Sequence, residues 1–320
     1  MSIIEKAANR IGKPAAPAAP LAQVRTQAIP AACEPMMDGP DVTVAELPED
    51  QVPVAHAPAQ GPTVALSNPE PAAPEPQRRN TRMIELDLAR MNEAGLVTAA
   101  GGRTNLVEDF RVIKRPLIKR AFGARKPNAN PGNLIMITSS LPGEGKTFTS
   151  INLAMSIAME LDHTVLLVDA DVARPSVLRT LGLPAQRGLM DILLDDRLDM
   201  SEVMLRTNVN TLSILPAGTS NPRATELLAS QAMKSLVLEI ADRYPDRIVI
   251  FDSPPLLLTS EAHVLASHMG QIVVVVESEK TTQHAVKEAL HQLEGCSNVN
   301  LVYNKSRELN TSSKYDYHYG

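Results

Sequence analysis

A short glycine-bearing loop, SSLPGEGKT at 139–147, joins an apolar run to a helical segment. Gly143 and Gly145 allow backbone N–H groups to turn inward around phosphate oxygens, and the helix that follows adds the partial positive charge of its N-terminus. Lys146 is spaced to reach the β- and γ-phosphates of a nucleotide, and the Thr147 hydroxyl is spaced to hold Mg²⁺. The pattern therefore predicts a phosphate-binding loop, although Ser140 replaces the first glycine of G-x-x-x-x-G-K-[ST].

Three aspartates follow two further apolar runs. Asp169 and Asp171 end VLLVDAD at 165–171, and Asp252 ends RIVIFD at 247–252. Alternate residues of a strand point the same way, so Asp169 and Asp171 can face one site. Either could bind Mg²⁺, directly or through water, or act as a base toward an incoming hydroxyl. Asp252 matches the acid that holds Mg²⁺ or its water in P-loop proteins.

Two related nucleotide-binding classes differ from this chain at single positions. The Asn304–Lys305 pair is similar to the guanine-reading N-K-x-D motif, but residue 307 is arginine, so ATP is the expected nucleotide. A partitioning-type ATPase would carry a second lysine early in the loop, where this chain has Leu141.

The region around these motifs alternates short apolar runs with helical segments. Most runs are continuously apolar, which is typical of strands buried on both faces of a parallel sheet. Helices between them would form right-handed crossovers, with ligands bound at the carboxyl ends of the strands. The sequence therefore predicts an α/β P-loop NTPase with a doubly wound, mostly parallel sheet. The runs lie at 134–139, 164–171, 211–218, 247–255, 271–278 and 299–305.

Composition divides the chain further. Residues 1–13 predict a short amphipathic helix, and residues 14–80 a disordered Pro/Ala-rich linker that holds more than half of the 25 prolines. Residues 81–126 return to helical patterns, the phosphate-loop domain is expected over 127–308, and a tyrosine-containing tail over 309–320. The first helix could dock on a partner, on a membrane surface or on its own domain.

The segment at 81–126 carries two features. Apolar residues between Met83 and Met91 recur at helical spacing, and basic residues are in excess from Arg103 to Lys126. Such a basic run is either a solvated helix face or a contact with acidic lipid or an acidic partner.

Bulk properties exclude several classes. A formal net charge of -5 gives no reason to expect nucleic-acid binding. No apolar stretch approaches the ~18 residues of a membrane span, and the N-terminal apolar run is too short and too charged for a secretory signal. Cys33 and Cys296 match no metal or redox spacing. We expect a protein that stays in the cytoplasm.

Three of the five tyrosines, Tyr315, Tyr317 and Tyr319, fall in the last six residues. Tyrosine at every second position serves no packing purpose in a polar terminal segment. Beside the phosphate-site motifs, this cluster predicts phosphorylation of the chain's own tail.

These motifs resemble those of the bacterial tyrosine kinases. SSLPGEGKT, VLLVDADVARP and IVIFDSPPLL are similar to that family's Walker A, A′ and B motifs, and LPAGTSNPRATELLAS to its L-P-A-G…E-L-L segment. Glu108, Arg111 and Lys114 resemble its E-x-x-R-x-x-R oligomerisation motif, with lysine in the last place. The MSIIEKA start and the Pro-rich tether further resemble the exosortase-associated exopolysaccharide autokinases.

The resemblance implies a set of roles. Phosphoryl transfer from ATP would involve Lys146, Asp169, Asp171 and Arg174, and Mg²⁺ would be held by Thr147, Asp171 and Asp252. The residues expected at the nucleotide are Gly143, Glu144, Gly145, Lys146, Thr147, Phe148 and Asn304.

The resemblance also implies partners. The tail would be phosphorylated in trans inside a ring-shaped homo-oligomer, and phosphate charge would then weaken the ring. A membrane-spanning polysaccharide chain-length determinant would hold the kinase at the inner face of the membrane. Two alternatives remain at this point: a regulatory ATPase of the partitioning or division-placement class, and a non-catalytic adaptor that binds nucleotide.

Overall fold

The structure, a computed structural model, describes residues 82–124, 129–244 and 246–306. The helix predicted at 1–13, the linker predicted at 14–80 and the tail at 309–320 lie outside the described residues. None of the helices in the described ranges has the length and hydropathy needed to span a bilayer.

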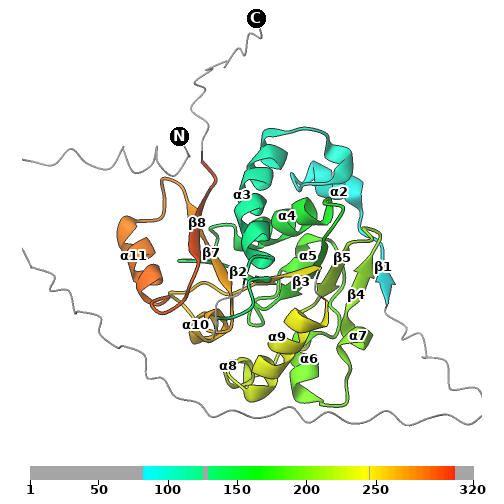
Figure 1. Ribbon diagram of the computed structural model, residues 1–320, viewed down its shortest axis with the longest axis vertical. Helices are drawn as coiled ribbons and strands as arrows, with labels where there is room; N and C mark the ends of the chain where they lie inside the picture. The colour runs from blue at the N-terminus through cyan, green and yellow to red at the C-terminus, as the bar shows by residue number, and fades with distance from the viewer. Residues whose placement is uncertain (1–81, 125–128, 245, 307–320) are drawn as a thin grey trace, which may run out of the picture. The chain divides into compact units, whose positions relative to one another are not determined.

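An eight-stranded sheet runs through the described part of the chain, in the order β1-β4-β5-β3-β6-β2-β7-β8 (Figure 1). Neighbouring strands are parallel except β4 and β5, which pair antiparallel. All six predicted runs form strands, so the prediction of a doubly wound, mostly parallel sheet is confirmed. The strands are β1 Met83–Ile84, β2 Leu134–Ser139, β3 Thr164–Asp169, β4 Leu205–Thr207, β5 Leu212–Leu215, β6 Arg247–Asp252, β7 Gln271–Glu277 and β8 Val299–Asn304.

Helices cover both faces of this sheet (Figure 1). One face packs against α2 Leu88–Glu93, α3 Asn105–Ala121, α4 Lys146–Ala158 and α5 Val177–Thr180. The other packs against α6 Leu189–Leu194, α7 Met200–Val203, α8 Ala224–Leu228, α9 Gln231–Arg243, α10 Ser260–Ala266 and α11 Gln283–His291. A short 3-10 helix spans Ala99–Gly101.

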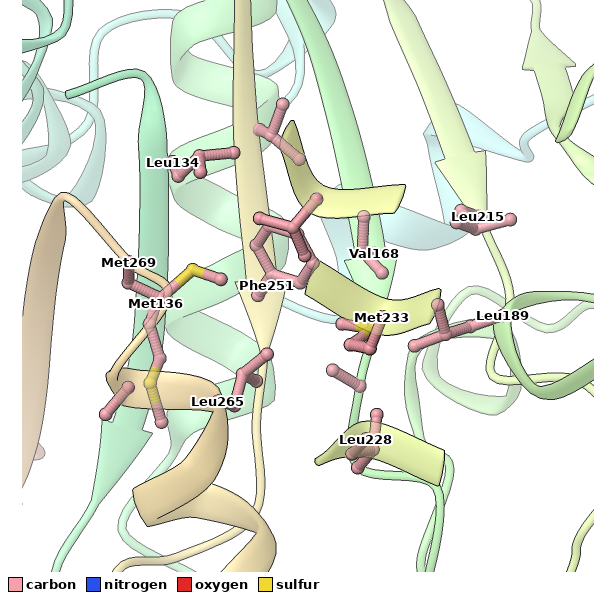
Figure 2. Close-up of a cluster of buried hydrophobic side chains, with 14 of the residues drawn as sticks. Leu134, Met136, Val168, Leu189, Leu215, Leu228, Met233, Phe251, Leu265 and Met269 are labelled. Atoms are coloured by element: carbon pink, nitrogen blue, oxygen red, sulfur yellow. The ribbon is translucent and has the colours of Figure 1, made fainter. Parts of the chain in front are cut away.

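Alternation along the central strands divides the core into two apolar clusters. In β2, Leu134 and Met136 enter one cluster while Ile135 and Ile137 enter the other, because successive side chains point to opposite faces. Figure 2 shows Phe251 of β6 in the first cluster, among side chains from β2, β3, α9 and α10. Because the central strands are buried on both faces, their carboxyl ends, where the candidate site lies, are held in place.

The segment that begins at Met83 corrects one prediction. A helix was expected from Met83, but Met83–Ile84 form strand β1 beside β4, and helix α2 begins only at Leu88. The backbone of Leu86 explains the difference, since its N–H and carbonyl both bond the side chain of Asn208, at 2.9 and 3.1 Å. These tertiary bonds replace the helical bonds that the apolar spacing suggested.

Helix α3 is fixed to the end of α4 by a buried lysine. The last four carbonyls of a helix have no partner within it. In α4, the carbonyl of Ser156 accepts from Lys114 Nζ at 2.5 Å, and that of Ala158 accepts from the Thr211 hydroxyl at 2.5 Å. Lys114 also pairs with Glu160 at 2.5 Å, and the residue is only 4% exposed.

Replacing Lys114 by methionine should therefore destabilise the fold. The Lys114→Met variant keeps most of the side-chain volume but leaves the Ser156 carbonyl without its donor. We expect a loss of about 1–3 kcal/mol in the free energy of unfolding. Urea denaturation measures this, with Arg115→Met on the exposed side of α3 as the matched control. Equal free energies of unfolding for Lys114→Met and Arg115→Met would contradict the stabilising role assigned to Lys114.

Candidate active site at the phosphate loop

The loop between β2 and α4 brings Lys146 to an acid of the neighbouring strand. Gly143 and Gly145 adopt φ of 84° and 98°, the left-handed region that favours glycine, and α4 then begins at Lys146. Lys146 Nζ donates to Asp171 Oδ2 at 2.7 Å, with the side chains 12% and 6% exposed. The predicted loop lysine and the second predicted acid thus form a nearly buried ion pair.

A second pair forms one residue further along α4. The Thr147 hydroxyl donates to Asp252 Oδ2 at 2.7 Å, and it lies 2.7 Å from the Ser176 hydroxyl. Thr147 has a single hydroxyl hydrogen, so Ser176 is the donor in the second bond. The other oxygen of Asp252 accepts from Ser150 at 3.0 Å. Sequence reasoning missed both serines, because a single serine within α4 or just before α5 carries no distinctive spacing.

Asp169 has a different set of contacts. Its Oδ2 accepts from the backbone N–H groups of Ser176 and Val177, at 3.0 and 2.9 Å. Its Oδ1 is buried and has no hydrogen-bond partner among the described residues. Asp169 also lies opposite Asp252 in the register of β3 and β6.

Burial of these acids disfavours their charged forms. Burial, together with the charge of Asp252, raises the pKa of Asp169 from 3.8 to about 7. Burial also raises the pKa of Asp252, against the opposing effects of Lys146 and Thr147. Asp171 and Asp252 interact with Lys146, whereas the charged neighbours of Asp169 are these two acids. An additional cation would offset the negative charge of the three carboxylates.

The residues present fit a magnesium ion. The hydroxyls of Thr147 and Ser176 and the carboxylates of Asp171 and Asp252 are all hard oxygen donors. Mg²⁺ is held in proteins by one or two carboxylates together with phosphate oxygens and water. The chemistry of the donors is therefore the one that Mg²⁺ bound to a phosphate chain requires.

Four further predicted residues lie around the loop. Glu144 is 2% exposed, and its carboxylate accepts from the Leu141 N–H at 2.7 Å and from the Thr281 hydroxyl. Phe148 packs against the apolar cluster of the α3–α4 face. Asn304 donates to the Glu144 carbonyl at 2.8 Å. Arg174 is exposed, and its backbone N–H donates to Asp171 at 3.2 Å.

A cavity of about 120 Å³ opens beside Asp169. Its walls are mostly apolar, with Asp169 and Arg179 as the charged members. The lining residues are Asp169, Pro175, Leu178, Arg179, Leu183, Ala185, Gln186, Pro216, Ala217 and Gly218.

The predicted oligomerisation residues separate into two kinds. Glu108 and Arg111 form an ion pair on the outer side of α3, where both side chains are substantially exposed. Lys114 instead bonds α4 of its own chain and is buried. In this conformation Lys114 is not available to a neighbouring subunit. The predicted acceptors Tyr315, Tyr317 and Tyr319 lie outside the described residues.

Comparison with known proteins places this site in a family context. The model of a family described as an AAA domain matches residues 132–306, which is more than half of the chain. The tyrosine-protein kinase YwqD of Bacillus subtilis is 35% identical over 185 residues, covering 58% of this chain and 76% of that protein. The putative tyrosine-protein kinase CapB of Staphylococcus aureus is 29% identical, covering 58% of this chain and 80% of that protein.

One of the solved structures similar to this chain is also a tyrosine kinase domain. The kinase domain of the Escherichia coli tyrosine kinase ETK superposes with a TM-score of 0.55 at 27% identity. The match covers 67% of this chain and 81% of that domain.

The raised pKa of Asp169 predicts a pH-dependent stability. A folded state that holds its proton up to about pH 7 binds more protons than the unfolded chain between the ordinary pKa of 3.8 and about 7. The nucleotide-free protein should therefore lose stability as the pH rises through that window. Asp169→Asn keeps an acceptor for Ser176 and Val177 but removes the charge.

We expect Asp169→Asn to gain stability relative to the wild type on going from pH 5 to pH 8, by at least about 1 kcal/mol. Thermal melts in a chelating buffer measure this. The control is Asp162→Asn, at an exposed carboxylate outside the site. Parallel pH profiles for the wild type and Asp169→Asn would show that Asp169 does not carry the effect.

Proposed function

This chain belongs to the bacterial tyrosine kinases built on an AAA domain, and from that premise we propose that it transfers the γ-phosphoryl group of ATP to tyrosine hydroxyls. The observation that carries the proposal is the convergence of Lys146 and Thr147 with three carboxylates at adjacent strand ends. The kinase domain is proposed over residues 127–308.

Lys146 and the loop backbone bind the phosphate chain in this proposal. The Lys146–Asp171 pair keeps the ammonium in the site before nucleotide arrives, and Lys146 then reaches the β- and γ-phosphates. Thr147, Asp171 and Asp252 would hold Mg²⁺, which would supply positive charge to offset the charge that develops on the phosphate oxygens. Arg174 lies three residues after Asp171 in the chain, and its side chain is proposed to approach the same phosphates. In the structure its contact with Asp171 is made by the backbone N–H.

The acceptor tyrosine is proposed to enter beside Asp169. The free Oδ1 of Asp169 is suited to take the phenolic proton, because Asp171 is already paired with Lys146. The phenolic oxygen then bonds to the γ-phosphorus, the bond from that phosphorus to the β–γ bridging oxygen breaks, and ADP leaves. The mostly apolar cavity lined in part by Asp169 lies on the side from which the acceptor ring is proposed to approach.

The tail supplies the acceptors in this proposal. Tyr315, Tyr317 and Tyr319 are phosphorylated in trans within a ring-shaped homo-oligomer, to which the exposed Glu108 and Arg111 contribute. The family resemblance further suggests control of exopolysaccharide synthesis through a membrane-spanning chain-length determinant, which would place the kinase at the inner face of the membrane.

The partitioning class of ATPases is the less favoured alternative. Leu141 occupies the position of that class's second lysine, and Glu144 binds the Leu141 N–H, which shapes the loop without one. The relatives reported above are named as tyrosine kinases. Release of free phosphate without label on tyrosine would favour this alternative.

Removing the loop lysine should abolish tyrosine labelling. With labelled ATP and Mg²⁺, the wild type should place phosphate on tyrosine, and Lys146→Met should reduce the rate at least about 100-fold, because one preorganised donor is worth that much. Lys287→Met, at an exposed position of α11, should retain the wild-type rate. Labelling that survives in Lys146→Met would refute the assigned role.

Transfer in trans can be tested with two complementary variants. A chain with Tyr315, Tyr317 and Tyr319 all changed to phenylalanine keeps its site but has lost its acceptors. Mixed with a size-tagged Lys146→Met chain, it should place label on the tagged chain alone. Absence of label in this mixture, with wild type active in parallel, would argue for transfer within one chain.

A further inference from the structure

The phosphate loop requires donors on its outer side as well as an anion on its inner side. The peptide unit is planar and trans, so its carbonyl points opposite to the N–H of the following residue. A loop that turns its N–H groups inward therefore turns the paired carbonyls outward. Carbonyls that are not solvated need a donor from elsewhere in the chain.

Two residues near the end of the sheet supply those donors, and a third bonds a side chain of the loop. Lys305 Nζ donates to the Gly143 carbonyl at 2.6 Å, and Asn304 Nδ2 donates to the Glu144 carbonyl at 2.8 Å. The Thr281 hydroxyl donates to the Glu144 carboxylate. We call Thr281, Asn304 and Lys305 the loop clamp.

Each bond of the clamp fixes the direction of one loop N–H. Lys305 holds the carbonyl of the Gly143–Glu144 peptide, so it sets the N–H of Glu144. Asn304 holds the carbonyl of the Glu144–Gly145 peptide, so it sets the N–H of Gly145. The approach is close, because a Cβ added to Gly145 would come within 2.0 Å of Asn304 Nδ2.

The clamp is itself anchored to the sheet. Lys305 Nζ pairs with Glu277 at the end of β7 at 3.2 Å, and the Ser278 N–H bonds the Asn304 carbonyl at 2.9 Å. Lys305 adopts a φ of 56°, a conformation unusual for lysine. Lys280 shares Glu277 at 3.3 Å but has no bond to the loop in the described structure.

We propose that Lys305 and Asn304 are positioning residues that orient the loop N–H groups toward the phosphates of a nucleoside di- or triphosphate. The proposal assigns their effect to the bonds that they make to the loop carbonyls. The Asn304–Lys305 pair, which elsewhere could read a guanine base, is used here on the phosphate loop. This inference rests on the nucleotide site of the proposed function.

The test is the affinity for Mg-ADP, measured by calorimetry on the full chain. Lys305→Met should weaken binding about tenfold, the effect of one charge-assisted bond. Lys305→Arg retains a cationic donor and should recover most of the affinity. Lys280→Met removes the other lysine on Glu277 and should stay within twofold of the wild type. In tyrosine labelling, Lys305→Met should raise the KM for ATP more than it lowers kcat.

A second variant guards against a purely structural effect. Asn304→Ala opens space beside Gly145 and should also weaken Mg-ADP binding several-fold, while thermal melts of the nucleotide-free protein change little. Unchanged Mg-ADP affinity in both Lys305→Met and Asn304→Ala would overturn the clamp while leaving the kinase assignment in place. A wild type that binds no Mg-ADP would overturn the proposed function together with the clamp.

Discussion

The concentration of negative charge at the ends of β3 and β6 is the constraint on which the site depends. Asp169 and Asp252 lie opposite each other in adjacent strands, and Asp171 follows two residues later. Burial raises the pKa of Asp169 and of Asp252, and Lys146 is the only lysine in the described structure that bonds an acid of this cluster, namely Asp171. Such a cluster is costly in a protein that has no cation to bind, because isolated buried carboxylates lose hydration without compensation. The arrangement is consistent with a site that gains its full charge balance when a metal and phosphates arrive together.

The scaffold tolerates this cost because the strands that carry the acids are buried on both faces. β6 is buried along its whole length and β3 along all but its first residue, so the strand ends cannot move apart without opening the apolar core. The loop is held by hydrogen bonds instead: the Glu144 carboxylate accepts from the Leu141 N–H within the loop, and Lys305 and Asn304 donate to carbonyls on its outer side. Charge repulsion is therefore opposed by packing on one side and by hydrogen bonds on the other, which keeps the donors in place before a ligand binds.

Features set by local sequence patterns could be predicted from the sequence, whereas contacts between residues far apart in the chain could not. The central strands could be predicted because burial on both faces demands continuous apolar runs, and the loop because close backbone approach demands glycine. Strands β1 and β4 were missed because two or three residues leave no periodicity to detect. Ser176 and Lys305 were missed as functional contacts because their partners lie 29 and 162 residues away. Lys114 shows the converse case, since the resemblance to an oligomerisation motif implied a contact between subunits while the fold buries it against α4.

Contacts between residues far apart in the chain also help to assign roles to Asp169 and Asp171. The sequence alone does not say which of the two acts as the base and which holds the metal. Both acids follow β3 and could face one ligand, but their neighbours differ. Asp171 uses one oxygen on Lys146 and the other on the Arg174 N–H. Asp169 uses one oxygen on two N–H groups and leaves the second, which is buried, without a hydrogen-bond partner in the described structure. A carboxylate with one fixed and one free oxygen is oriented and still able to accept a proton, whereas an acid bonded at both oxygens is better suited to hold charge in place. Asp169 is thus the better candidate for the base, and Asp171 for the electrostatic partner of Lys146 and of the metal.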